Sequence, residues 1–278
     1  MIASWTVQDT ARVLRKPTAA DDKYTRGVLG VRTGSETYPG AAVLGVEAAW
    51  RAGVGMVRYL GPRTPTALVL QRRPETVTAD GRVQAWLIGS GTDPTHRTDV
   101  ETTTLRGILS SPLPVVVDAG ALDLVPSAEA PMIVTPHGRE HARLRALLGL
   151  AEDSPTDDEA RAASAVQTAA ALGATVVLKG AVTIVASADG WATAVSVGTP
   201  WLATAGTGDV LAGAIGAVVS AGSPEIDLAH LAAAGVWLHG RAAALRAGDL
   251  GPEGGPITAG DVAEALPRAA AEALSTHY

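Results

Sequence analysis

The segment TAGTGDVLAGAIGAVV carries the clearest chemical signal in this chain. Gly206, Thr207 and Gly208 precede an apolar helix, so their N–H groups can form a pocket for anionic oxygen at the positive end of the helix dipole. Asp209 follows in the first turn, where it could accept a proton from a hydroxyl that attacks a phosphoryl group held in that pocket. An ordinary helix-capping aspartate would explain the same residue.

Other reactive side chains follow short apolar runs. His137 and Glu140 in TPHGRE are three residues apart, so they share one face of a helical turn and could both point into a cleft. A glutamate also stabilises a first turn through the helix dipole alone. Lys179, one of three lysines, opens KGAVT, where its ammonium could meet a phosphate or reach solvent. Asp118 could order a metal, a water or a sugar hydroxyl, or cap the next turn.

Two glycine loops also follow apolar runs. RTGSETYPGAA, with Gly34 and Gly40, leads into a helix N-terminus that favours anions, while IGSGTD, with Gly89 and Gly91, permits close backbone approach. Both loops could equally be turns that need a positive φ. The sequence has no GxxxxGK[ST] motif, and no GxGxxG follows the first strand. The absence of these motifs argues against classical P-loop hydrolysis and against hydride transfer by a standard dinucleotide-binding fold.

These residues must be positioned by alternating strands and helices. Short apolar runs bounded by Gly, Pro or Asp predict buried strands at 28–31, 54–60, 85–88, 115–117, 132–134, 175–178 and 182–186. Helical patterns occur at 40–52, 96–109, 140–148, 157–172, 209–221, 226–247 and 258–274, with Thr156 or Asp157 as an N-cap. The alternation predicts an α/β fold with a mostly parallel sheet and helices on both faces. No linker divides the chain, so we predict one domain over residues 1–278.

Composition excludes several classes of protein. The 278 residues include no Cys, which removes disulfides, Cys-ligated zinc, iron–sulfur clusters and thiol catalysis. A net charge of −6 argues against general binding of nucleic acid or anionic membranes. No apolar run is long enough to span a bilayer, and the N-terminus shows no export signal, so we expect a cytoplasmic protein. Its 19 Arg against 3 Lys, together with abundant Ala, suggest a GC-rich bacterial genome.

Taken in order, the motifs resemble those of the ribokinase-like superfamily and, more narrowly, of the NAD(P)H-hydrate dehydratases that use ADP or ATP. The resemblance runs from about Lys23 to Leu274 and rests on KYTRG, GSETYPGAAVLGVEAAWRAGVGMV, IGSGTD, VVVDAGAL, IVTPHGRE, VVLKGAVT and TAGTGDVLAG. The GAAVL…RAGVG block with TPH…E separates this family from the vitamin and sugar kinases of the same fold. The resemblance implies a three-layer α/β/α fold.

It also implies a reaction. The enzyme would be a lyase of metabolite repair that dehydrates the (S)-form of hydrated NADH or NADPH, in which water has added at C6 of the nicotinamide ring. A nucleotide would phosphorylate the C6 hydroxyl, ADP being converted to AMP and phosphate, and the phosphate would then leave with help from the ring nitrogen. Asp209 would activate the hydroxyl, and the backbone of Gly206, Thr207 and Gly208 would stabilise the phosphoryl charge.

By the same matching, the remaining site residues receive roles. The hydrated substrate should contact Ala41, Gly91, His137 and Asp209. The nucleotide should be held by Lys179, Gly180, Ala181, Val182, Thr183 and Gly208. Glu140 matches a glutamate that acts near Mg²⁺ through water. Bacterial members characteristically use ADP and eukaryotic members ATP, so the composition favours ADP.

The chain departs from the family pattern at two places: Arg139 stands where a Gly is usual, and Ala205 replaces the second glycine before the late motif. Both changes could reshape the nucleotide loop. About 22 residues precede KYTRG, so we predict no fused epimerase domain and a separate NAD(P)H-hydrate epimerase as functional partner. The family also implies a homotetramer. One alternative is a kinase of a small alcohol such as hydroxyethylthiazole or hydroxymethylpyrimidine, and another is a non-catalytic nucleotide-binding protein.

Overall fold

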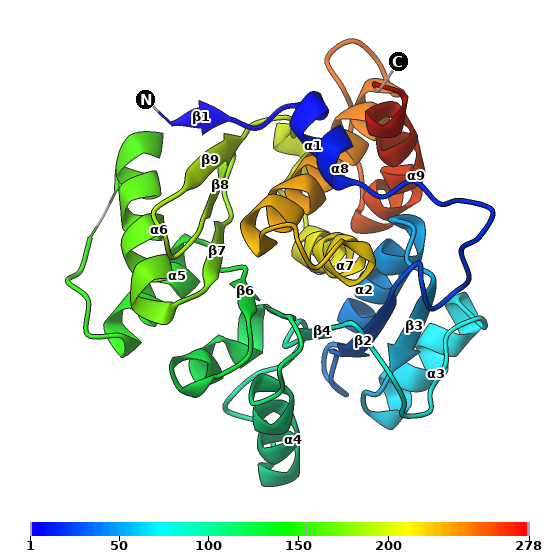
Figure 1. The fold of residues 1–278 in the computed structure, drawn as a ribbon, viewed down its shortest axis with the longest axis horizontal. Coiled ribbons are helices and arrows are strands. Elements are labelled where there is room, and N and C mark those ends of the chain that lie inside the picture. The colour runs from blue at the N-terminus through cyan, green and yellow to red at the C-terminus, as the bar shows by residue number, and fades with distance from the viewer. Residues whose placement is uncertain (1, 154, 277–278) are drawn as a thin grey trace.

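A single sheet runs through the computed structural model, which describes residues 2–153 and 155–276. Within these residues the sheet has nine strands, in the order β1-β9-β8-β7-β6-β5-β4-β2-β3 (Figure 1). The strands are β1 (Ala3–Ser4), β2 (Val28–Arg32), β3 (Met56–Tyr59), β4 (Ala85–Ile88), β5 (Val115–Val117), β6 (Met132–Val134), β7 (Thr175–Leu178), β8 (Thr183–Ala186) and β9 (Ala192–Val195). Only β8 runs against its neighbours, so the ends of all the other strands point the same way.

Helices cover both faces of this sheet. The helices are α1 (Val7–Val13), α2 (Pro39–Arg51), α3 (Arg63–Arg72), α4 (Asp99–Leu109), α5 (Gly138–Leu147), α6 (Asp158–Leu172), α7 (Thr207–Ala221), α8 (Leu228–Gly248) and α9 (Ala259–Ser275), with 3-10 turns η1 (Ala119–Ser127) and η2 (Pro200–Leu202). One hydrophobic cluster joins α1, α2, α3, α7, α8 and α9 to one face, and a second joins α4, η1, α5 and α6 to the other. The three-layer α/β/α fold predicted from the resemblance is therefore present.

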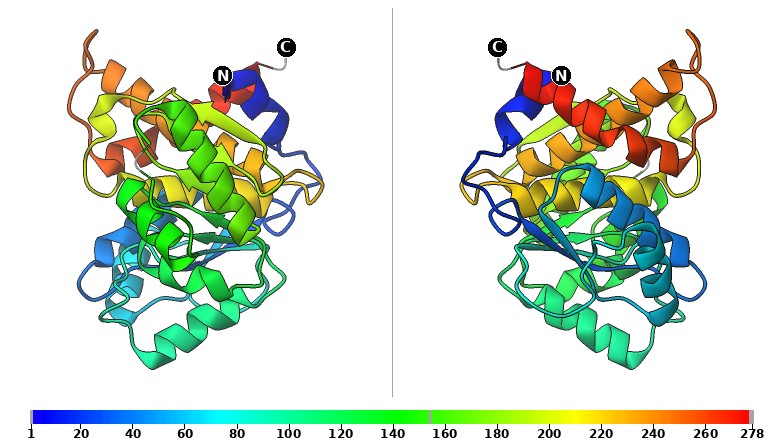
Figure 2. Two further views of the ribbon diagram at one scale, coloured as in Figure 1. Left: turned by 90° about the vertical axis from the view of Figure 1, so that its left-hand side faces the viewer. Right: turned by 90° about the vertical axis from the view of Figure 1, so that its right-hand side faces the viewer.

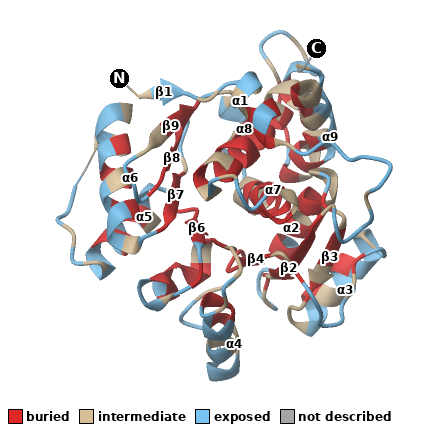
Figure 3. Ribbon diagram, viewed as in Figure 1, coloured by how far each residue is buried: buried red, intermediate tan, exposed pale blue. Residues whose placement is uncertain are grey.

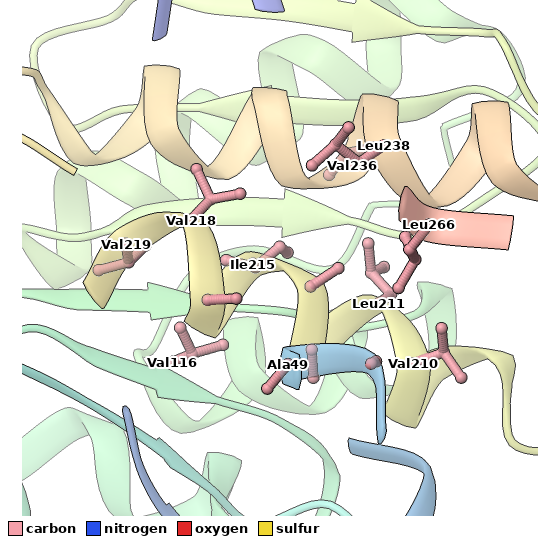
Figure 4. Packing of buried hydrophobic residues seen from close by; sticks show 14 of the residues in the cluster. Ala49, Val116, Val210, Leu211, Ile215, Val218, Val219, Val236, Leu238 and Leu266 are labelled. Carbon is pink, nitrogen blue, oxygen red and sulfur yellow. The ribbon is translucent and has the colours of Figure 1, made fainter. Parts of the chain in front are cut away.

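Helix α7 lies at the centre of the larger cluster. Every residue from Val210 to Ser220 is buried, so the helix is apolar on all sides and packs between α2 and α8 (Figure 4). Small residues allow the close approach: a methyl group placed on Gly213 would lie 2.3 Å from the carbonyl oxygen of Gly45 in α2. Figure 3 shows the same distribution of burial, since the strands, α7 and α8 are mostly buried while α4 and α6 each expose one side. The hydrophobic core thus surrounds α7 from Val210 onward and fixes the position of the helix start.

The predicted strands all appear within two residues of their expected bounds, and the predicted helices within three. The largest correction concerns His96, which was expected to begin a helix: α4 begins at Asp99 instead, because the side chain of Thr98 caps it. Asp157 caps α6, as predicted. The sequence did not predict β1, β9, α1, α3 or either 3-10 turn. Figure 2 shows that α1 lies beside α9, at the end of the molecule where both termini are found.

None of the helices within residues 2–153 and 155–276 is both long enough and apolar enough to cross a lipid bilayer.

Candidate active site

Four neighbouring parallel strands, β4 to β7, bring polar side chains together where they end. Ser90, Asp118, Thr135 and Lys179 each lie within two residues of one of these ends, and we call them the strand-end cluster. The buried carboxylate of Asp118 accepts hydrogen bonds from Ser90 Oγ (2.9 Å), Thr135 Oγ1 (2.7 Å) and Lys179 Nζ (2.8 Å). Asp118 is the N-cap residue of the 3-10 turn η1 but makes no side-chain capping hydrogen bond, and its carboxylate instead binds a lysine and two hydroxyls.

Lys179 lies between this carboxylate and the N-terminus of α7. Its backbone N–H donates to the carbonyl oxygen of Pro136 at 2.9 Å, and its Nζ lies 3.8 Å from Glu140 Oε2. A methyl group placed on Gly208 would lie 3.7 Å from the same Nζ. Burial lowers the pKa of Lys179, but the carboxylates of Asp118 and Glu140 outweigh it, so the pKa is raised overall. The lysine therefore stays charged where an anion would meet α7.

The N-terminus of α7 has no side-chain cap. Its N-cap is Gly206, at φ +88°, and no side chain accepts from the first turn, whereas α1, α4, α5, α6, α8 and α9 are all capped by side chains. The positive φ favours glycine here, and Cδ1 of Leu44 would lie 2.6 Å from an added methyl group. The hydroxyl of Thr207 is used to bind the carbonyl oxygens of Leu202 and Thr204, both at 3.0 Å. The N–H groups of this turn remain available to an anionic ligand.

Asp209 in this first turn is a stronger base than an ordinary aspartate. Burial, and then the neighbouring Asp118, raise its pKa to about 6, while Lys179 opposes the shift. A carboxylate with this pKa is ionised at neutral pH and yet accepts a proton more readily than an exposed one. Asp209 lies in the first turn of α7, as predicted, and its role as a general base stays a prediction.

Helix α2 begins beside α7 and contributes a second wall. Leu44 meets Gly206, and Gly45 lies near Asp209, so the two helices start at the same end. Ala41 in the first turn of α2 packs against Gly91: a methyl group on Gly91, which has φ +65°, would lie 2.3 Å from the Cβ of Ala41. The predicted substrate residues Ala41 and Gly91 thus touch each other in a place that admits no larger side chain on Gly91.

His137 and Glu140 form a reciprocal cap on α5. Nδ1 of His137 accepts from the N–H groups of Arg139 (3.2 Å) and Glu140 (3.3 Å), and Glu140 Oε2 accepts from the N–H of His137 (2.8 Å). Both residues were expected to share one face of a turn, and they do. The cap fixes the imidazole so that Nε2 carries the proton of the neutral ring, 3.5 Å from Glu140 Oε1.

The predicted nucleotide residues Gly180, Ala181 and Val182 lie in the turn from β7 to β8, and Thr183 is the first residue of β8. Arg161 of α6 holds this turn, because its guanidinium donates to the carbonyl oxygens of Val182 (2.7 Å), Leu178 (3.3 Å) and Lys179 (3.4 Å). A methyl group on Gly180 would lie 2.4 Å from Arg161 Nη2, so the arginine needs glycine there. The two departures from the family pattern, Arg139 and Ala205, are both exposed.

Sequence reasoning missed Ser90, Thr135, Arg161 and His239. His239 of α8 is buried behind α7, and burial lowers its pKa to about 4, although a hydrogen bond with the backbone of Thr207 opposes this. Helix α8 also contains His230, and nothing in its Ala-rich sequence distinguishes His239. Ser90 and Thr135 could have been suspected, because both follow predicted strands whose ends share one edge of the sheet.

The donor groups fit a magnesium ion bound mainly through phosphates and water. No group of three or more His, Asp or Glu side chains within the described residues could hold a metal by itself. Glu140 is partly buried beside Lys179, and Mg²⁺ commonly binds one or two carboxylates together with substrate phosphates. Glu140 can therefore take the role implied by the resemblance.

The mostly parallel sheet, the uncapped N-terminus of α7 and the raised pKa of Asp209 define an α/β protein in which a carboxylate lies at a helix start that could bind an anion. The sequence model of the NAD(P)H-hydrate dehydratases matches residues 29–268, and the chain belongs to this family. It is 39% identical over 264 residues to the ADP-dependent (S)-NAD(P)H-hydrate dehydratase of Neisseria meningitidis, covering 87% of this chain and 84% of the relative. The family expected from the sequence is thereby confirmed.

Further similarities concern length and fold. The chain is 43% identical over 265 residues to the bifunctional NAD(P)H-hydrate repair enzyme Nnr of Mycobacterium leprae, covering 90% of this chain but 52% of that protein. It thus spans about half the length of the bifunctional relatives. The crystal structure of the ADP/ATP-dependent NAD(P)H-hydrate dehydratase of Bacillus subtilis, co-crystallised with ATP and Mg²⁺, superposes with a TM-score of 0.84 at 28% identity, covering 98% of this chain and 99% of that one.

Proposed function

We propose that this protein dehydrates the (S)-form of hydrated NADH and NADPH to the normal dinucleotides, converting ADP to AMP and phosphate. The observation that carries the proposal is Asp209, a carboxylate with a pKa of about 6 in the first turn of an uncapped helix. A base and an anion pocket in one turn suit the phosphorylation of a hydroxyl. The Neisseria relative, which is named for this activity, supports the choice of substrate.

The first step is transfer of the terminal phosphoryl group to the C6 hydroxyl of the hydrated ring. Asp209 takes the hydroxyl proton as the oxygen attacks phosphorus and the bond to the bridging oxygen of ADP breaks. The N–H groups at Gly206 to Gly208 and the ammonium of Lys179 stabilise the charge on the transferring group. The second step breaks the C6–O bond: phosphate leaves, the ring nitrogen supplies electron density, and loss of a proton from C5 restores the double bond.

In this proposal the substrate and the nucleotide meet at Asp209. Ala41, Gly91 and His137 contact the hydrated ring, and the fixed Nε2–H of His137 is a hydrogen-bond donor for it. The turn from Lys179 to Thr183, together with Gly208, holds the nucleotide. ADP is the expected phosphoryl donor.

Magnesium belongs to the same proposal. Mg²⁺ bound to the nucleotide neutralises negative charge on its phosphates. Glu140 would hold the ion, with water between them. Its carboxylate is kept in place by the N–H of His137 and by Lys179 nearby.

The proposal also includes a functional partner, an oligomeric state and a cellular location. The relatives that carry both repair functions match this chain over about half of their length, and we propose that this dehydratase works together with an NAD(P)H-hydrate epimerase. We also propose a homotetramer in the cytoplasm. Light scattering on the purified protein measures the assembly, and a monomeric mass would contradict it.

The direct test is to incubate the protein with hydrated NADH, Mg²⁺ and either ADP or ATP. Absorbance of the reduced nicotinamide should recover, faster with ADP, and AMP and phosphate should appear in equal amounts. No recovery with either nucleotide would overturn the proposal. Mass spectrometry covers the kinase alternative, because a stable phosphorylated alcohol would remain in place of eliminated phosphate.

A further inference from the structure

His239 is a buried histidine to which the reaction described above assigns no role. It lies in α8 and exposes 8% of its surface. Its Nε2 is buried and has no hydrogen-bond partner among the residues that the structure describes. Buried polar atoms in folded proteins nearly always have a partner, and an unpaired one lowers stability. The presence of a histidine at this position therefore needs an explanation other than stability.

Helix α8 lies along α7 and brings His239 to the start of that helix (Figure 4). The two helices approach closely, since a methyl group placed on Gly235 of α8 would lie 2.8 Å from the Cα of Ile215 in α7. One residue after His239, a methyl group on Gly240 would lie 3.2 Å from the backbone nitrogen of Gly198, in the segment before α7. Helix α8 thus packs against both α7 and the segment that leads into it.

The imidazole of His239 is hydrogen-bonded to the backbone of Thr207, the first residue of α7. Burial lowers the pKa of His239 to about 4, and this hydrogen bond opposes the shift. A hydrogen bond raises the pKa of a histidine when the ring donates it, so the acceptor is the carbonyl oxygen of Thr207. Because Nε2 has no partner among the described residues, Nδ1 is the donor. The neutral ring therefore binds the start of α7 without adding a charge there.

Thr207 is held on two sides. Its hydroxyl donates to the carbonyl oxygens of Leu202 and Thr204, both at 3.0 Å, and its own carbonyl oxygen accepts from His239. A capping side chain would hold this turn through its N–H groups, and α7 has no such cap. The two contacts of Thr207 instead fix the turn and leave its N–H groups free for an anion.

We propose that His239 is a positioning residue, which fixes the first turn of α7 through the carbonyl oxygen of Thr207 and so holds the free N–H groups in place for the transferring phosphoryl group. The proposal rests on the proposed function for the identity of that group. His239 acts through Thr207 and not by contact with a ligand. Stabilisation of a transition state depends strongly on geometry, so a small displacement of this turn lowers the rate more than it lowers nucleotide affinity.

The first test measures the turn itself, by hydrogen exchange at the amides of Val210 and Leu211. The N–H of Val210 makes the first hydrogen bond within α7, to the carbonyl oxygen of Gly206 at 3.2 Å. His239→Leu removes the donor but keeps a side chain of similar size, so exchange here should become about fivefold faster. His239→Asn, whose amide can donate from the position of Nδ1, should restore exchange close to that of the wild type.

The second test separates positioning from stability. His239→Leu removes the unpartnered Nε2 together with the hydrogen bond, so the free energy of unfolding should not decrease. The kcat for repair of hydrated NADH should nevertheless fall by about tenfold, while the KM for ADP changes by less than about threefold. His239→Asn should recover most of kcat. A merely structural histidine would give a loss of stability and no such division between kcat and KM.

The matched control is His230→Leu, on the same helix, where the ring packs against Trp5 and Trp191. This variant should change neither exchange at the start of α7 nor kcat. Equal exchange in the wild type and His239→Leu would overturn the proposal, as would a kcat that His239→Asn does not recover. Failure of the wild type in the repair assay would count against the proposed function alone, because the exchange experiment uses no substrate.

Discussion

The strand-end cluster and a cavity of about 460 Å³, which Glu140, Arg143 and Leu147 of α5 help to line, adjoin each other, yet their side chains are fixed in different ways. Asp118 is buried, with three hydrogen-bond donors from three different strand ends. Arg143 and Leu147 are exposed on one helix. Groups that must meet a reacting phosphoryl group are thus held by the sheet, whereas these exposed side chains of the cavity wall are not. Catalysis depends on positioning to within fractions of an ångström, whereas binding of a flexible ligand tolerates adaptable contacts.

The largest expected effect tests the cluster side of this comparison. Asp209→Asn removes the base but keeps the shape of the side chain, so turnover of hydrated NADH should fall by a factor on the order of 10²–10⁴. Initial rates at saturating ADP measure it. Turnover close to that of the wild type would show that Asp209 merely belongs to the helix start and that the comparison is wrong.

The second effect concerns stability. Asp118→Ala leaves the partly buried Lys179 and two hydroxyls without their acceptor, so the free energy of unfolding should drop by about 3 kcal/mol. Asp118→Asn, which keeps a hydrogen-bonding side chain, should lose less. Denaturant unfolding of both variants measures this. As a control, Asp249→Asn breaks an exposed ion pair with Arg268 and should have almost no effect. Equal stability of Asp118→Ala and wild type would mean that the cluster is not rigidly held.

The third effect is on pH dependence. Asp209 must be ionised to accept a proton, and burial together with Asp118 raises its pKa to about 6, so kcat/KM should fall as the pH decreases through about 6. Asp118→Asn removes the second carboxylate charge, which lowers the pKa of Asp209 and moves this acid limb to lower pH.

The nucleotide phosphates also ionise near pH 6, but their ionisation affects the wild type and Asp118→Asn equally. The difference between their pH profiles therefore reports Asp209 alone. Identical acid limbs in wild type and Asp118→Asn would show that Asp118 does not act on the base.

The sequence predicts the parts of this molecule that depend on local patterns, and it misses the parts that depend on contacts between distant residues. The apolar strands and the GTGD turn are local patterns, so the sheet, the edge it presents and Asp209 could all be located in advance. The role of Asp118 could not, because its partner Lys179 is 61 residues away and the pairing depends on strand order. Arg161 was missed for the same reason, since the turn that it holds belongs to another element. The sequence also missed short elements, such as β1, which has two residues and forms by pairing with β9.

The smallest expected effect tests the cavity side. Arg143 is exposed and unpaired among the described residues, so Arg143→Ala should change the free energy of unfolding by less than about 0.5 kcal/mol. The same denaturant experiment that shows a loss for Asp118→Ala should show none here. A loss of stability comparable to that of Asp118→Ala would mean that Arg143 has a structural role. The cavity would then be held as firmly as the strand-end cluster, and the division between a rigid reacting region and an adaptable binding region would disappear.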